Sequence, residues 1–98
     1  DRVDRQWHPK TFAEAVDLLF QVLDEETLEI FAGRTAEELK FYHATAGELI
    51  KIHYRLAGGN PSLLDECRKI SGKPDLDGEQ AAIYILETFW ARLQMRKG

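Results

Sequence analysis

The chain of 98 residues is short of cysteine and of long apolar runs, and each shortage excludes a class of protein. Its single cysteine, Cys67, cannot form an intramolecular disulfide and argues against a cysteine-based metal site. No apolar stretch approaches the roughly 20 residues that a membrane-spanning helix needs, and no signal-peptide pattern is visible. We therefore expect a soluble, cytoplasmic protein without membrane association, in which Cys67 is a small core residue.

Basic charge is also scarce. The chain has 13 Lys and Arg against 17 Asp and Glu, for a net charge of −4. The first half, residues 1–49, holds 11 acidic and 5 basic side chains, whereas residues 50–98 hold 6 and 8. Nucleic-acid binding requires a concentrated basic surface, so we expect no nucleic-acid partner. The acidic first half instead favours a basic protein partner.

Alternation of period two, internal repeats and low-complexity tracts are absent, whereas apolar residues recur at helical spacing. The length suits one domain. The sequence therefore predicts an all-α fold, a compact bundle of about five helices in a single domain over 1–98, with 1–8 as an extended N-terminal arm. The predicted helices cover 12–23, 25–32, 36–57, 61–70 and 78–95.

The predicted helix starts have residues suited to N-caps. Asp24 precedes the second helix, and Asn60 precedes the fourth, which has Pro61 at its first position. Three pairs also have the spacing of a capping box, in which a side chain at the N-cap and one three residues later each accept a backbone N–H. These pairs are Thr11 with Glu14, Thr35 with Glu38, and Asp77 with Gln80.

Glycine marks the predicted helix ends. Gly33 is suited to a left-handed residue that closes the second helix, and Gly58 with Gly59 is expected to end the third. Gly47 lies inside the third helix, where glycine costs about 1 kcal/mol relative to alanine. We therefore expect the helix to bend at Gly47 or another element to pack closely against it.

Two histidines lie on the predicted 36–57 helix. His43 and His53 are ten residues apart, about 15 Å along a straight helix, so they cannot share a metal ion. Neither has the spacing to a second ligand that places two donors on one helical face. We therefore predict no metal and no cofactor, and a hydrogen-bonded core position for His43.

Catalytic groups have little support. Adjacent acidic residues such as Glu25 and Glu26 point about 100° apart on a helix, and no Gly-x-Ser-x-Gly motif is present. The segment 74–79 partly matches a calcium-binding loop, but Lys73 and Tyr84 stand where carboxylates are needed. The sequence thus predicts no catalytic residue, and an enzyme is the less favoured reading.

A candidate interaction surface combines aromatic and acidic residues. Phe41 and Tyr54 fall away from the main apolar stripe of the predicted third helix, and Glu25, Glu26 and Glu29 belong to the acidic second helix. The first hypothesis is therefore a non-catalytic protein-interaction or accessory domain. Its acidic half would face a basic partner, and its oligomeric state is left open.

Several motifs resemble a family of small, mainly bacterial helical domains of unknown function. The resemblance spans about residues 8–93 and implies a helical fold but no activity, substrate or cofactor. The matching residues are His8, Pro9, Thr11, Glu14 and Ala15, then His43, Gly47, Ile50, Leu56, Ser62 and Leu63, and finally Pro74, Asp75, Ile85, Leu86, Phe89 and Trp90.

The resemblance also implies a centre formed by His43, Gly47, Ser62 and the turn at Pro74 and Asp75. Gly47 would let that turn or the start of the fourth helix approach, and Asp75 could accept a hydrogen bond from His43. This centre is either a structural polar cluster or a site. In the second case the domain is a small enzyme, or binds an anion or ligand near residues 58–62 with the first N–H groups of the fourth helix.

Overall fold

The computed structural model describes residues 9–56 and 58–97, so the predicted arm at 1–8 lies outside the described residues. Within them the chain forms six α-helices, one short 3-10 helix and no strand, which confirms the all-α prediction. The elements are α2 (Phe12–Val22), α3 (Glu25–Ala32), α4 (Ala36–Leu39), η1 (Lys40–Tyr42), α5 (Ala46–His53), α6 (Pro61–Ser71) and α7 (Gly78–Lys97).

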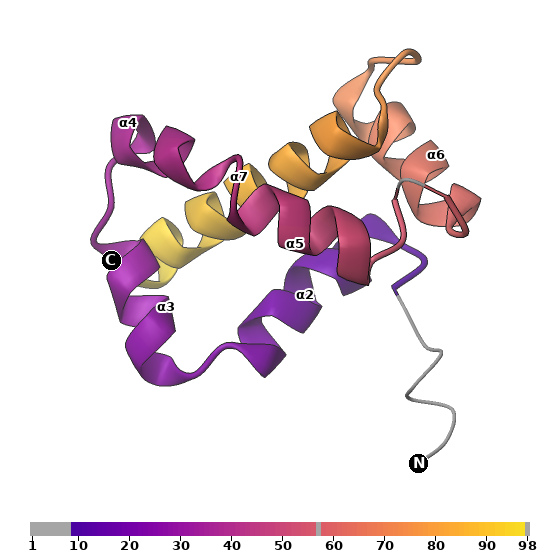
Figure 1. Cartoon of the computed structure of the whole chain (residues 1–98). Coiled ribbons are helices and arrows are strands. Elements are labelled where there is room, and N and C mark those ends of the chain that lie inside the picture. Colours follow the sequence, from indigo (N-terminus) through magenta and orange to yellow (C-terminus); the bar gives the residue numbers. More distant parts are fainter. Residues whose placement is uncertain (1–8, 57, 98) are drawn as a thin grey trace.

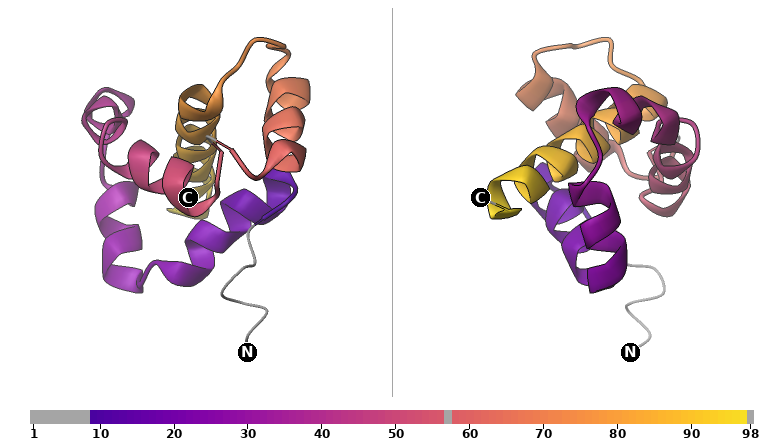
Figure 2. Two further views of the ribbon diagram at one scale, coloured as in Figure 1. Left: turned by 45° about the vertical axis from the view of Figure 1, so that its right-hand side comes forward. Right: turned by 90° about the vertical axis from the view of Figure 1, so that its left-hand side faces the viewer.

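Helix α7 is the central packing element. Figure 1 shows it passing behind α5 through the middle of the molecule, and the views of Figure 2 show α2, α3 and α6 arranged around it. A helix with a wide apolar stripe is expected to bury that stripe against its neighbours. Its buried side chains are Ala81, Ala82, Ile85, Leu86, Phe89 and Leu93.

The predicted N-caps are present, with one change. Both hydrogen bonds of the capping box form between Thr35 and Glu38. The Thr11 hydroxyl accepts the Glu14 N–H, but the Glu14 carboxylate accepts the N–H of Lys10 rather than that of Thr11. The remaining caps are Asp24, which accepts from Thr27, Asn60, which accepts from Leu63, and Asp77 with Gln80, which bond reciprocally.

The predicted helix over 36–57 is wrong as a single element. The chain leaves α4 for η1 and a turn, and α5 begins after Thr45. An unbroken helix of that length would be about 33 Å long, close to the full 35 Å extent of the molecule. The break instead separates α4 from α5, and α5 packs across α7 (Figure 1).

Helix α5 ends earlier than the predicted glycine pair. Arg55 has a left-handed φ of 58°. The Leu56 N–H donates to the Lys51 carbonyl over 2.9 Å, and the Arg55 N–H donates to the Ile52 carbonyl over 3.2 Å. These two bonds form a Schellman motif, in which glycine usually takes the left-handed position. An arginine therefore stops the helix, and the sequence carries no local signal for it.

The glycines at the ends of α3 and α6 differ. Gly33 has φ −85° and ψ −2°, a right-handed conformation, so the predicted left-handed residue is wrong there. Gly72 closes α6 with φ 75°, which favours glycine, and its N–H donates to the Arg68 carbonyl. At the end of α3, side chains of α7 supply donors instead: Trp90 Nε1 to the Arg34 carbonyl and Gln94 Nε2 to the Ala32 carbonyl.

Candidate functional site

An apolar groove lies between α2 and α5, with α7 as its floor. Its volume is about 730 Å³, within the range of binding cavities for small molecules and side chains. The last turn of α3 and the segment before α2 also border it, through Phe31 and Pro9. The α2–α5 groove is lined chiefly by Leu19 and Val22 of α2, Leu49 and Ile50 of α5, and Leu86 and Phe89 of α7.

The floor and the rim of the groove differ in exposure. Leu86 and Phe89 are almost fully buried. Val22 and Leu49 are 63% and 57% exposed, although both side chains are apolar. Isolated exposed apolar residues are ordinary, but here two such residues border the same apolar cavity. The groove is therefore an apolar surface that the described part of the chain does not cover.

Gly47 explains how α5 lies against α7. The residue is buried, and a Cβ added to it would be 3.6 Å from Ile83 Cγ1 of α7. The predicted close approach at Gly47 thus exists, but its partner is α7 rather than the turn at Pro74 and Asp75 or the start of α6. With Gly47 and Ile50 facing α7, Leu49 is directed toward the groove rim.

Tyr54 closes one end of the groove and is not part of an exposed surface. It is 4% exposed, and its hydroxyl donates to the Ala15 carbonyl over 2.9 Å. Burial raises the pKa of the phenol well above its ordinary value. The predicted exposed role for Tyr54 is therefore wrong. The residue ties the end of α5 to α2, because the two elements contact each other there.

The acidic residues of the predicted interaction surface lie on α3, which follows the α2 end of the groove. Glu25, Glu26 and Glu29 are exposed. Asp24, at the start of α3, accepts hydrogen bonds from Thr27, which lower the pKa of its carboxyl. The chain passes from Leu23, which lines the groove, directly into this acidic segment.

Phe41 lies on η1 and does not line the groove. It is 78% exposed. Its neighbour Tyr42 instead turns inward, where its ring lies 5.1 Å from the Phe31 ring. Phe41 and Tyr54 therefore do not form one surface, since only the first is exposed.

His43 pairs with Glu87 of α7 and not with Asp75. His43 Nε2 lies 3.4 Å from Glu87 Oε2, and the His43 side chain is 25% exposed. Nε2 is buried and makes no hydrogen bond of good geometry. The structure contains no hydrogen bond or ion pair between any two of His43, Gly47, Ser62 and Asp75, all of which lie in its described part. The predicted hydrogen bond from His43 to Asp75 is therefore wrong.

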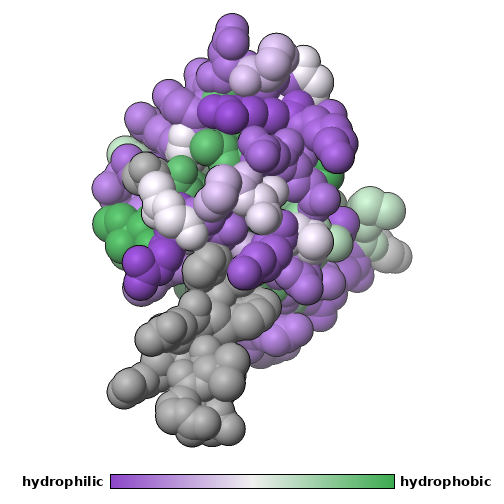
Figure 3. Space-filling view, turned by 90° about the vertical axis from the view of Figure 1, so that its right-hand side faces the viewer, coloured by the Kyte–Doolittle hydropathy of each residue, from purple (hydrophilic) through white to green (hydrophobic). Residues whose placement is uncertain are grey.

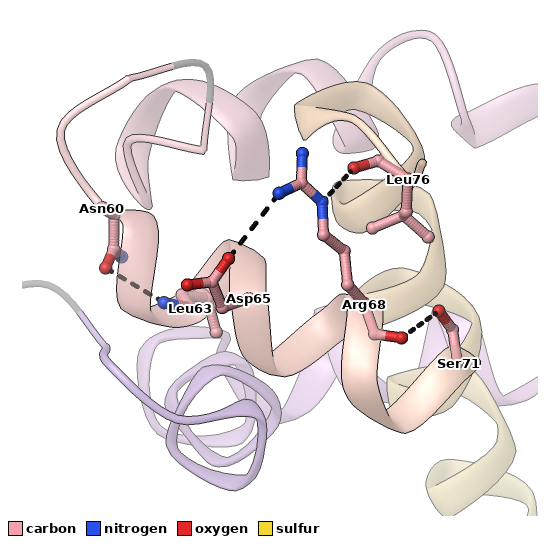
Figure 4. A network of polar contacts seen from close by, with 6 residues as sticks. All are labelled: Asn60, Leu63, Asp65, Arg68, Ser71 and Leu76. Atoms are coloured by element: carbon pink, nitrogen blue, oxygen red, sulfur yellow. Dashed lines mark hydrogen bonds and ion pairs between the residues drawn. The ribbon is translucent and has the colours of Figure 1, made fainter. Parts of the chain in front are cut away.

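The start of α6 is joined by hydrogen bonds of Asn60 to two other segments and is not an open anion site. Asn60 is 3% exposed, and its Nδ2 donates to the carbonyls of Pro9 and Tyr54 over 2.7 and 2.8 Å. Its Oδ1 accepts the Leu63 N–H, so that donor, predicted to hold an anion, is already used (Figure 4). Ser62 is exposed beside it.

Arg68 links α6 to the turn before α7. Figure 4 shows its side chain between Asp65 and Leu76. Arg68 Nε donates to the Leu76 carbonyl over 2.8 Å, and a terminal nitrogen lies 3.6 Å from the Asp65 carboxylate. Asp75, in that turn, is exposed. The described part of this side of the molecule is mainly hydrophilic, with small separate apolar areas (Figure 3).

A second, smaller cavity of about 310 Å³ lies beside Glu87. Lys73, Gln80 and Tyr84 also line it, so its wall is more polar than that of the groove. His43 and Asp75 are not among its lining residues. The cavity therefore does not bring the predicted cluster together.

Comparison of the chain with protein-family models, curated proteins and solved structures finds no match. The resemblance to the bacterial helical family thus stays a prediction. Residues 9–56 and 58–97 contain no group of three or more His, Cys, Asp and Glu side chains placed to hold a metal ion. In the same part of the chain, no helix is long and apolar enough to cross a membrane.

Sequence reasoning missed the groove because its rim residues look like core residues. Leu49 fits the apolar stripe of an unbroken 36–57 helix, and Val22 lies in the last turn of α2 between the stripe residues Leu19 and Leu23. One signal was available: Leu49 and Ile52 are three residues apart on α5, and both are exposed in the structure. That pair adds a second apolar face to a helix that is already buried through Gly47 and Ile50.

Proposed function

We propose that this chain is a non-catalytic protein-interaction domain that binds its partner in the α2–α5 groove. The observation that carries the proposal is the exposure of Val22 and Leu49 at the rim of an apolar cavity of about 730 Å³. Covering such a surface removes apolar area from water, which favours association by about 25 cal/mol per Å² before the costs of binding.

The chemistry of the groove wall supports binding rather than catalysis. Its polar side chains are those of Thr45, His53 and Tyr54, and the Tyr54 hydroxyl is occupied by the Ala15 carbonyl. Catalysis by a nucleophile or a general base needs a second group that activates or orients the first. No hydrogen bond between two of these three side chains occurs in the described structure.

The cellular setting forms part of the same proposal. The resemblance to a mainly bacterial family supports a bacterial origin. The buried, unpaired Cys67 supports a reducing compartment such as the cytoplasm.

The proposal can be tested by selecting peptides from a displayed random library against the whole chain. The selected peptides are then measured against Leu49→Glu, Val22→Glu and the control Ile70→Glu. Ile70 is 49% exposed on α6 and does not line the groove, so it provides the same chemical change elsewhere. Circular dichroism melting first establishes that each variant is folded.

We expect both groove variants to weaken peptide binding at least about tenfold, equivalent to about 1.4 kcal/mol. Ile70→Glu should leave it unchanged, because that side chain lies outside the groove. Peptides that bind both groove variants as tightly as the unaltered chain would overturn the proposal.

A further inference from the structure

We infer that the occupant of the α2–α5 groove is an amphipathic helix of a partner protein, with an apolar face and a basic face. This inference rests on the proposed function and specifies the partner. Helix-in-groove binding is a recurrent mode of peptide recognition, in which apolar side chains at positions i, i+3, i+4 and i+7 enter the groove.

The groove favours a helix over an extended segment. Its walls are helices, and the described residues contain no strand to whose edge a peptide could add. An extended segment would therefore bury main-chain N–H and C=O groups against apolar side chains such as Leu49 and Phe89 without partners. A helix satisfies most of these groups internally, so it loses less free energy when it enters.

The charges around the groove favour a basic partner. Asp24, Glu25, Glu26 and Glu29 follow the α2 end of the groove, and the described residues place no Lys, Arg or His within ion-pair distance of these carboxylates. The positive end of the α3 macrodipole offsets only about half a charge. A surplus of negative charge thus remains beside an apolar surface.

The other charges near the walls are largely balanced. On α5, Lys51 Nζ lies 3.3 Å from the Glu48 carboxylate. On α2, Asp17 lies 3.5 Å from an Arg92 nitrogen of α7. The acidic start of α3 is therefore an uncompensated cluster of negative charge next to Leu23 of the groove, whereas the single cations Lys10 and Arg55 follow the lining residues Pro9 and Tyr54. The acidic cluster repels an anionic membrane, and the net charge of −4 disfavours a second copy of the chain.

The test uses two 18-residue peptides that have the same leucines at helical spacing. In one peptide all the remaining positions are lysine, and in the other they are glutamate. Fluorescence anisotropy measures their binding to the unaltered chain. It also measures binding to Leu49→Glu and to the double variant Glu25→Lys/Glu26→Lys. A matched control, Asp75→Lys/Glu79→Lys, changes two exposed carboxylates by the same charge away from the groove.

We expect the lysine peptide to bind at least about tenfold more tightly than the glutamate peptide. The Glu25→Lys/Glu26→Lys variant should reduce this preference at least about threefold, and the control by less. Added salt should also reduce it, because exposed charges are screened. Leu49→Glu should weaken binding of both peptides.

The outcomes separate the two proposals. Equal binding of both peptides, weakened by Leu49→Glu, would overturn the basic partner but keep the groove as the binding surface. Binding unaffected by Leu49→Glu would overturn the groove as well. If Glu25→Lys/Glu26→Lys and the control Asp75→Lys/Glu79→Lys reduce the preference for the lysine peptide equally, a role for α3 would be contradicted. Concentration-dependent dimerisation abolished by Leu49→Glu, or binding to anionic lipid vesicles, would overturn the partner helix in favour of those occupants.

Discussion

The start of α6 and the α2–α5 groove are neighbours, but they are built in opposite ways. Pro9 and Tyr54 line the groove, and their carbonyls accept the two hydrogen bonds of the buried Asn60 side chain. On the α6 side, polar groups are paired and Leu63 is fully buried. On the groove side, Leu49 has a similar apolar side chain but remains exposed.

This difference separates the part of the fold that supplies stability from the part that is free to bind. Asn60 joins the segment before α2, the end of α5 and the start of α6, and it thereby holds one end of the groove in place. The rim residues contribute little to the folded state, because water still contacts them. A binding surface can thus be kept apolar without loss of the surrounding fold.

The largest expected effect comes from the same substitution made in each region. Leu63→Ala should lower the free energy of unfolding by about 2–5 kcal/mol, because it leaves a cavity in a fully buried position. Leu49→Ala should change it by less than about 0.5 kcal/mol. Urea unfolding measures both. Similar losses at the two positions would show that the groove is closed in solution.

Asn60→Ala is expected to have the next largest effect. It removes an N-cap and leaves the buried carbonyls of Pro9 and Tyr54 without donors, so we expect a loss of about 2–4 kcal/mol in urea unfolding. Asn60→Asp keeps the acceptor for the Leu63 N–H but places a carboxylate against the two carbonyls. It should be at least as destabilising. If the aspartate variant is as stable as the unaltered chain, Asn60 stabilises the fold only as an N-cap, and its hydrogen bonds to the Pro9 and Tyr54 carbonyls contribute nothing.

Arg55→Gly tests the end of α5, where the chain leaves the groove wall and continues toward Asn60. A side chain in the left-handed region costs about 1–2 kcal/mol, and glycine removes this cost. The added freedom of glycine in the unfolded chain offsets part of the resulting gain in stability. We expect a net stabilisation of about 0.5 kcal/mol by thermal or urea unfolding. Arg55→Ala retains the Cβ and should give no gain. A stabilising alanine would contradict the assigned helix end.

The smallest effect at neutral pH concerns Cys67, in the buried face of α6. Burial, with a lesser contribution from the Glu66 carboxylate, raises the pKa of the thiol from 9.0 to about 11. The Cys67 thiol therefore loses its proton at a higher pH in the folded state than in the unfolded state. The free energy of unfolding consequently falls as the pH rises from about 9 to 11.

Stability measured by urea unfolding at several pH values should fall less steeply in Cys67→Ala, because that variant lacks the titrating thiol. Lysine and tyrosine titrations are common to both proteins. A thiol reagent should also react with the unaltered chain only after unfolding. Identical slopes for the two proteins, or rapid modification of the folded chain, would contradict the burial of Cys67.

Helix starts were predictable because their stabilising groups are local. Asp24, Thr35 and Asp77 each bond a backbone N–H three residues away, so a short window of sequence contains the whole interaction. Helix type and approximate position followed from apolar periodicity for the same reason. The candidate site was less predictable: Glu25, Glu26 and Glu29 are exposed as the surface hypothesis requires, whereas Tyr54 is buried.

The remaining features depend on contacts between distant segments. His43 pairs with Glu87, Tyr54 with Ala15, and Asn60 with Pro9, at separations that periodicity does not encode. The helix break at residues 43–45 and the stop at Arg55 have no glycine or proline at those positions that would mark a local break. The primary structure thus specifies where the capped helices α2, α3, α4, α6 and α7 begin, but not where α5 begins. The mutual packing of the helices alone leaves Leu49 in water and buries Leu63, because the burial of an apolar side chain depends on which other segments reach it.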